Sequence, residues 1–120
     1  MKVRGIRGAI TVKEDTPQEV LEATKELLFK IKEENEFAVE DIASILFTVT
    51  SDVRSIFPAQ AARMIGWDKV PLLCFQEIEV PGALPKCIRV LVHINTEKSQ
   101  EEIRHIYLRE AKKLRQDLSS

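Results

Sequence analysis

The chain has 120 residues, enough for one domain, and its 44% hydrophobic and 31% charged residues are typical of a folded globular protein. Its net charge of −1 lacks the basic excess of proteins that bind nucleic acids, and no apolar run approaches the roughly 20 residues of a membrane span. Cys74 and Cys87 do not form a closely spaced pair, and His93 and His105 are isolated. We therefore expect a cytoplasmic protein with free thiols, no metal site and no cofactor.

The N-terminal segment, residues 2–12, predicts a β-strand that contains two arginines and two glycines. Alternation places Arg7 on one face with the small residues Gly5 and Ala9, and Arg4 on the other face. The small neighbours leave room beside the Arg7 guanidinium. A charged side chain in mid-strand is costly unless it is paired or faces a cavity, so Arg7 is a candidate binding residue.

The next segment predicts a helix that ends near Asn35. Thr16 can cap it, Pro17 suits the first helical position, and Glu19 completes a capping-box pattern with Thr16. Apolar residues then recur at helical spacing, which indicates one buried face.

Three more strands and a short helix follow in the prediction. Residues 42–50 and 70–80 read as strands, and residues 58–65 read as a short helix that ends at a glycine. A loop rich in proline then leads to an antiparallel strand at 87–95, which has one uniformly apolar face and carries Arg89 on the other.

The C-terminal segment is ambiguous from pattern alone. Ser99 and Glu102 resemble a second capping box, and the apolar residues beyond them have helical spacing. Periodicity therefore predicts a continuous helix over 99–115.

The predicted order of elements is β-α-β-α-β-β, which favours an α+β fold with a mixed sheet and helices on one face. The other face then needs cover, and strand arginines point to it. A homo-oligomer that seals this face is a natural outcome.

Two strand arginines, Arg7 and Arg89, are the main candidates for chemistry. Arginine presents planar, paired donors that match carboxylates, so the two favour a small anionic ligand. The alternative is a structural network in which they pair with Glu77 or Glu79. Motifs for a nucleophile, a phosphate-binding loop or a dinucleotide site do not occur in the sequence.

Four other residues have both a structural and a functional reading. Glu77 is an ion-pair partner or an acceptor for a hydroxyl, and Tyr107 is a core tyrosine or a donor to a carboxylate. Cys74 alone reads as a small buried residue, and Phe57 alone reads as a packing anchor.

Several motifs resemble one enzyme family when they are taken together. They are R-G-I-R-G-A-I-T-V from Arg4, Thr16-Pro17, F-P-A-x-A-x-R from Phe57, V-P-L-L-C-x-Q-E from Val70, I-R-V from Ile88, I-R-H-I-Y-L from Ile103 and L-R-x-D-L from Leu114. In this order they resemble the trimeric chorismate mutases of the AroH type, across most of the chain.

The resemblance implies one domain over residues 1–120 with a chorismate mutase/YjgF-like fold, a homotrimer with sites between subunits, and a mobile tail from about residue 110. It implies the rearrangement of dianionic chorismate to prephenate in aromatic amino-acid biosynthesis, with no cofactor, metal or covalent intermediate. In that family the tail resembles a short helical turn and then an extended piece near Tyr107, and we prefer this to the continuous helix.

The resemblance also implies roles for individual residues. Positions matching Arg7, Arg89 and Tyr107 bind the carboxylates and the ether oxygen, and those matching Cys74 and Glu77 meet the ring hydroxyl. Arg7, Glu77 and Arg89 are the expected catalytic residues. Because Cys74 and Glu77 have opposite parity, a regular strand cannot aim both side chains at one ligand. A bulge between them or a backbone contact from Cys74 would resolve this.

Further positions match residues from a neighbouring subunit, walls of the site and a closing tail. These are Phe57, Ala59 and Arg63 from the neighbour, Leu73 and Leu114 as walls, and Arg115 in the tail. The sequence departs from relatives at Gln60, where some have lysine, and at Gln116, where proline is common.

Two alternative functions remain at this point. An imine or enamine deaminase of the RidA/YjgF type resembles this family in fold and also uses a strand arginine. A non-catalytic module that binds small anions would keep the arginines without turnover.

Overall fold

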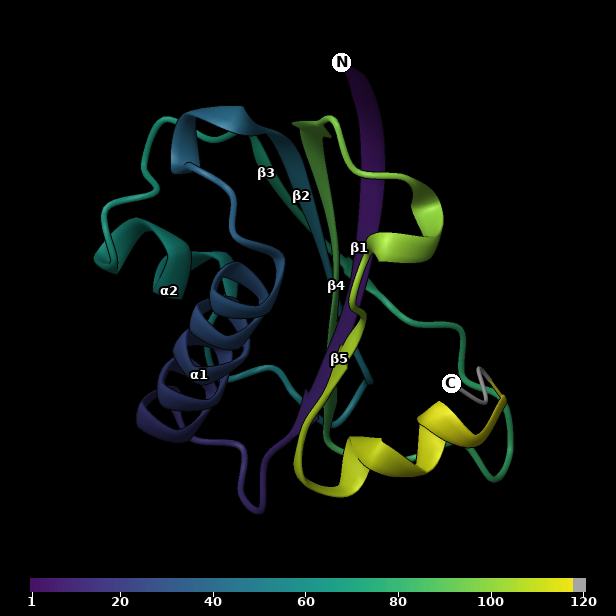
Figure 1. The fold of residues 1–120 in the computed structure, drawn as a ribbon. Coiled ribbons are helices and arrows are strands. Elements are labelled where there is room, and N and C mark those ends of the chain that lie inside the picture. The colour runs from purple at the N-terminus through teal and green to yellow at the C-terminus, as the bar shows by residue number, and fades with distance from the viewer. Residues whose placement is uncertain (118–120) are drawn as a thin grey trace.

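The computed structural model describes residues 1–117, in which five strands form one sheet with the order β3-β2-β4-β1-β5. The strands are β1 (Lys2–Thr11), β2 (Ile42–Val49), β3 (Leu72–Gln76), β4 (Cys87–Thr96) and β5 (Ile106–Tyr107). The helices are α1 (Pro17–Asn35) and α2 (Ala59–Met64), with the 3-10 helices η1 (Val39–Asp41), η2 (Gln100–Glu102) and η3 (Arg109–Asp117). Both α-helices cover the same face of the sheet, which confirms the mixed α+β fold (Figure 1).

The sheet combines antiparallel and parallel pairs. Strand β4 is antiparallel to both β1 and β2, whereas β3 is parallel to β2 and β5 is parallel to β1. Strands β3 and β4 therefore run in opposite directions, as predicted, but β2 lies between them. The loop that joins them must cross the end of β2, and this brings residue 77 toward β4.

The helix-covered face holds the main core. The even-numbered residues of β4, Ile88 to Ile94, are buried there, as are Leu27 and Ile31 of α1. Gly8 of β1 makes the close approach of α1 possible. A Cβ atom at Gly8 would lie 2.7 Å from Cδ1 of Ile31.

We expect the substitution Gly8→Ala to lower the free energy of unfolding by about 1–3 kcal/mol, because overpacking a filled core forces side chains or backbone to shift. The new methyl would also lie within 3.2 Å of Val90 and Leu27, so three buried side chains would have to move together. Urea denaturation of both proteins measures the difference. Gly5→Ala is the matched control, since its methyl would meet the half-buried Leu91, which faces away from α1. Equal stability of Gly8→Ala and the wild type would contradict this packing.

Helix α1 begins and ends where the sequence predicts, but its N-terminal cap is only half of a capping box. The Thr16 hydroxyl accepts from the Glu19 N–H at 3.2 Å. The Glu19 carboxylate does not return a bond to Thr16; it accepts instead from the N–H groups of Lys13 and Glu14. The Thr16 N–H donates instead to the carbonyl of Glu14 in the preceding turn, so this donor is not available to the Glu19 carboxylate.

The prediction of a strand over 70–80 is wrong at both ends, because β3 spans only Leu72–Gln76. Strand β3 is an edge strand and pairs only with β2. Beyond Val49 the chain stays paired with β4, since the Thr50 N–H donates to the carbonyl of Cys87. Glu77 makes the last contact of β3 with β2, from its N–H to the carbonyl of Val49.

The continuous helix predicted from periodicity over 99–115 is also wrong. The capping box of Ser99 and Glu102 forms, but η2 is a single turn. The chain then extends along the free edge of β1, where Leu108 donates its N–H to the carbonyl of Ala9. Backbone hydrogen bonds to the edge of β1 thus form in place of those of a helix. A turn followed by an extended piece is what the resemblance to the trimeric chorismate mutases implied.

The second face of the sheet, which is opposite to α1 and α2 and is called the open face below, is covered only at one end. There η3 packs Ala111 and Leu114 against Ala9, Cys87 and Tyr107. Elsewhere large apolar side chains remain exposed, including Leu73 (59% exposed) and Phe75 (47%). Within residues 1–117, the helices lack the length and apolar character that crossing a membrane requires.

Candidate active site

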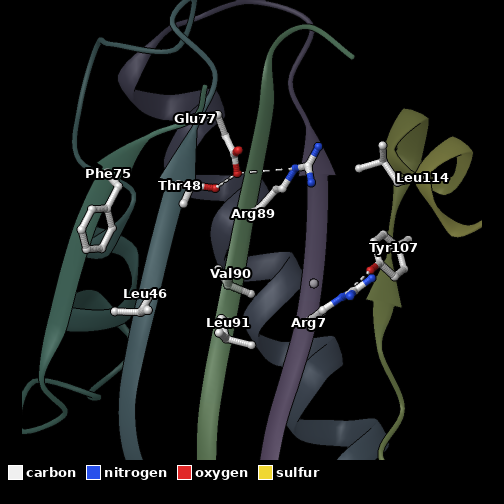
Figure 2. Close-up of a pocket in the computed structure, with 11 residues that line it drawn as sticks. Arg7, Leu46, Thr48, Phe75, Glu77, Arg89, Val90, Leu91, Tyr107 and Leu114 are labelled. Carbon is white, nitrogen blue, oxygen red and sulfur yellow. Dashed lines mark hydrogen bonds and ion pairs between the residues drawn. The ribbon is translucent and has the colours of Figure 1, made fainter. Parts of the chain in front are cut away.

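A cavity of about 570 Å³ opens on this second face of the sheet, beside η3 (Figure 2). Five of the residues singled out from the sequence line it: Arg7, Glu77, Arg89, Tyr107 and Leu114. They come from β1, the end of β3, β4, β5 and η3, so five separate segments build one site. The rest of the lining is largely apolar, so the cavity presents a few charged groups against an apolar wall.

Arg89 and Glu77 face each other across one side of the cavity. The Glu77 Oε2 atom lies 3.7 Å from Nε of Arg89, which is an ion pair but too long for a hydrogen bond. The Thr48 hydroxyl donates to the same carboxylate oxygen. Nε of Arg89 is buried, and the structure offers it no hydrogen-bond acceptor among the described residues. Since a buried donor costs free energy when unpaired, the 3.7 Å ion pair leaves the Arg89 guanidinium with unused hydrogen-bonding capacity.

Arg7 and Tyr107 form the opposite side. Nε of Arg7 points to the Tyr107 hydroxyl at 3.4 Å, a long hydrogen bond. The backbone of Arg7 is held separately, since its N–H donates to Nδ1 of His105 at 2.9 Å. The Tyr107 ring is buried while its hydroxyl reaches the cavity. Both readings of this tyrosine therefore apply, because its ring packs and its hydroxyl is available.

The charges in the cavity favour an anion. Strand alternation places the guanidinium groups of Arg7 and Arg89 on the same face of neighbouring strands, where Arg7 is paired with Leu91 and Arg89 with Ala9. Two guanidinium groups face one carboxylate, which leaves an excess of positive charge. A small dianion with a polar hydroxyl would complement this set.

The two cysteines are poor nucleophiles in this setting. Cys74 pairs with the buried Phe47 in the sheet register, so its side chain lies on the face opposite to Glu77. It lines a different cavity of about 520 Å³, together with Phe57. Burial raises the pKa of the Cys74 thiol and also that of the Cys87 thiol. Both thiols are therefore neutral near pH 7, and thiolate chemistry is not what this site offers.

Four further candidates lie outside the first cavity. Phe57 is 71% exposed, whereas Ala59, the first residue of α2, is buried. Arg63 is exposed and its guanidinium donates to the Gln60 side chain at 3.4 Å, which gives Gln60 a structural partner. Leu73 is exposed and is paired in register with Leu46, which does line the cavity. The side chains of Arg115 and Gln116 lie outside the described part of the chain.

Sequence reasoning missed Thr48, which the structure places beside Arg89 in the sheet register and in hydrogen-bond contact with Glu77. The signal was present in the alternation of residues 42–50, because the face opposite to Ile45 and Phe47 carries Leu46 and Thr48. The role of this face in the site follows from the pairing of β2 with β4, which the sequence pattern does not reveal. Within residues 1–117, no cluster of three or more histidine, cysteine or acidic side chains could hold a metal ion.

Comparisons with known proteins agree on one family. Residues 3–118 match the family model for chorismate mutase type I. The chain is 56% identical over 119 residues to chorismate mutase AroH of Thermus thermophilus, covering 98% of each chain. It is 49% identical over 120 residues to chorismate mutase AroH of Bacillus subtilis (strain 168), covering 99% of this chain and 94% of the relative.

A solved structure is similar throughout the fold. The chorismate mutase from Clostridium thermocellum superimposes with a TM-score of 0.90 at 49% sequence identity, covering 91% of this chain and 97% of that one. Neither the deaminase nor the anion-binding alternative is favoured by any of these relatives.

Proposed function

Because the chain belongs to the chorismate mutase type I family and is a chorismate mutase, an isomerase of aromatic amino-acid biosynthesis, we propose that its reaction takes place between Arg7, Glu77 and Arg89. The observation that carries this proposal is the convergence of Arg7, Glu77 and Arg89 on one cavity, where Arg89 and Glu77 remain 3.7 Å apart. The guanidinium of Arg89 therefore keeps hydrogen-bonding capacity for an oxygen atom of the substrate.

The reaction sets two tasks for the protein. Within one molecule a C–O bond breaks while a C–C bond forms, so no proton has to move and no base or nucleophile is needed. The site must hold the flexible enolpyruvyl arm over the ring, which is an effect of proximity and orientation. It must also stabilise the charge that separates between the ether oxygen and the ring.

The cavity offers a group for each task. Arg89 would stabilise the negative charge that grows on the ether oxygen. Glu77 would accept a hydrogen bond from the ring hydroxyl and would lie near the positive charge that develops on the ring. Arg7 and Tyr107 would hold a carboxylate from the other side, where the long 3.4 Å contact between them leaves both as donors to a ligand. The ground state and the transition state both carry the carboxylates, so this clamp serves mainly binding.

We also propose a cytoplasmic homotrimer in which each cavity is completed by a neighbouring subunit. The exposed Phe75, Leu73 and Val3 on the open sheet face support this, since such apolar area favours contact with another copy. Phe57 and Arg63 are exposed and stand away from their own subunit's cavity. We propose that these two residues contribute to the cavity of a neighbour, and the family resemblance adds Ala59 and the tail residue Arg115 to them.

The direct test is to incubate the purified protein with chorismate, with and without a chelator, and to follow the loss of chorismate absorbance and the formation of prephenate. We expect equal turnover in both samples, because none of the proposed steps uses a metal. A protein that leaves chorismate unchanged but releases ammonia from an imine would overturn the proposal in favour of a deaminase.

We expect kcat to vary by less than about threefold between about pH 6 and about pH 8, because the reaction has no proton transfer and so lacks the bell-shaped dependence of acid–base catalysis. Steady-state kinetics across this range measure it, with circular dichroism at each pH as the control for folding. A kcat that falls about tenfold per pH unit within the range would contradict a pericyclic step.

A further inference from the structure

Thr48 of β2 lies on the open face of the sheet, next to other groups that line the cavity. In the sheet register it is paired with Arg89 of β4 on one side and with Phe75 of β3 on the other. Its hydroxyl donates to Oε2 of Glu77 (Figure 2). It is half-buried and is itself a lining residue.

The Glu77 side chain needs a hydrogen bond to orient it, because Glu77 lies beyond the end of β3 and is not fixed by strand pairing there. Strand β3 ends at Gln76, and the backbone of Glu77 keeps one bond to β2, from its N–H to the carbonyl of Val49. The backbone bond fixes where the residue sits but not where its carboxylate points. The Glu77 side chain is 30% exposed, and its carboxylate is oppositely charged to Arg89, whose Nε lies 3.7 Å away.

Without the hydroxyl, the favoured arrangement of this pair is a direct one. An arginine and a carboxylate form short, often two-pronged hydrogen bonds when nothing else holds them. That arrangement would consume donors and charge of the Arg89 guanidinium, the group that the proposed reaction needs for the substrate. It would also consume the carboxylate oxygens that would accept from the ring hydroxyl.

We propose that Thr48 is a positioning residue, whose hydroxyl holds the Glu77 carboxylate off Arg89 and so keeps both groups available to the substrate. This inference rests on the proposed function, in which Glu77 accepts from the ring hydroxyl and Arg89 faces the ether oxygen. It predicts that the loss of the hydroxyl weakens transition-state stabilisation more than substrate binding. The reason is that an Arg89 side chain neutralised by Glu77 stabilises less of the negative charge that grows in the transition state.

The experiment compares four variants by steady-state kinetics with chorismate. Thr48→Val keeps the β-branched shape and removes the hydroxyl, Thr48→Ala removes it by a second route, and Thr48→Ser retains it. Ser44→Ala is the matched control, because Ser44 lies on the same strand and its hydroxyl contacts His93 instead of Glu77. We expect kcat to fall roughly 10- to 100-fold in the first two, the range for a hydrogen bond to a charged group, with a smaller change in KM. Thr48→Ser and Ser44→Ala should stay within about threefold of wild type.

A double-mutant cycle separates this inference from the proposed function. If Thr48 acts through Glu77, Thr48→Val should cause little further loss in a Glu77→Gln background. A severe effect of Glu77→Gln combined with a normal kcat in folded Thr48→Val would overturn the inference and leave the proposed function standing. Fully additive losses would also overturn it. A normal kcat in Glu77→Gln would contradict the proposed function at this residue, and the inference with it.

Discussion

Replacement of Arg89 by citrulline is expected to lower kcat by roughly 10²–10³-fold, by analogy with the removal of one donor from an oxyanion hole. Citrulline keeps the shape of the side chain and most of its donors but removes the positive charge. As the C–O bond breaks, the ether oxygen gains negative charge, so a fixed cation is worth more in the transition state than in the bound substrate. KM should therefore change less than kcat.

The structure explains why the charge of Arg89 would act at full strength. Its Nε atom is buried, and the structure gives it no hydrogen-bond acceptor among the described residues. The carboxylate of Glu77 remains 3.7 Å from it. The guanidinium is thus oriented by its strand and a neighbouring charge without being neutralised by a close contact. Such an arrangement needs little reorganisation when the reaction begins.

Two further substitutions serve as comparisons in the same kinetic series. Arg89→Lys should also lower kcat strongly, because the point charge of lysine on a flexible side chain does not reproduce the planar donors of arginine. Arg7→Ala should act mainly on KM, because a carboxylate clamp is used in both states. Circular dichroism confirms folding of each variant. A folded citrulline variant with near-normal kcat would show that positioning alone accelerates the reaction.

Mixing the variants Arg7→Ala and Arg63→Ala is expected to restore activity if the sites are shared, when the assay uses chorismate well below the raised KM of each variant. In randomly mixed trimers, a site takes Arg7 from one subunit and Arg63 from its neighbour, so roughly a quarter of sites would carry both wild-type residues. Reversible dissociation, mixing and reassembly, followed by the chorismate assay, measures the recovery. The position of Arg63, exposed and away from its own cavity, motivates the pairing.

The matched control mixes Arg7→Ala with Arg89→Ala. Both residues line the same cavity in one subunit, so every site in these mixtures lacks one of them and activity should not return. Recovery in the control, or none in trimers shown by mass spectrometry to be mixed, would count against shared sites. A monomer in analytical sedimentation would end the idea.

The local features of the fold were accessible from sequence because they depend on neighbours along the chain. The alternation of β1 and β4 placed Arg7 and Arg89 opposite to the core, and Thr16 and Pro17 marked the start of α1. The end of β3 and the path of the tail were not accessible. They depend on how far β3 pairs with β2 and on the free edge of β1, which are set by contacts distant in sequence.

The candidate site shows the same division. Charged residues within strands drew attention to Arg7, Arg89 and Glu77, and the structure brings them to one cavity. Thr48 carries no unusual signal by itself, because a threonine in a strand is ordinary. Its contact with Glu77 arises from the parallel pairing of β2 with β3, which pattern alone did not predict.

The most direct test of this account is a crystal structure with a bicyclic transition-state analogue that carries the two carboxylates, the ether oxygen and the hydroxyl of the reacting molecule. We expect its ether oxygen to accept from Arg89, its hydroxyl to donate to Glu77 and a carboxylate to lie between Arg7 and Tyr107. Phe57 and Arg63 of a neighbouring subunit should contact the same molecule. An analogue bound elsewhere on the protein, or one whose ether oxygen has no contact with Arg89, would contradict the account.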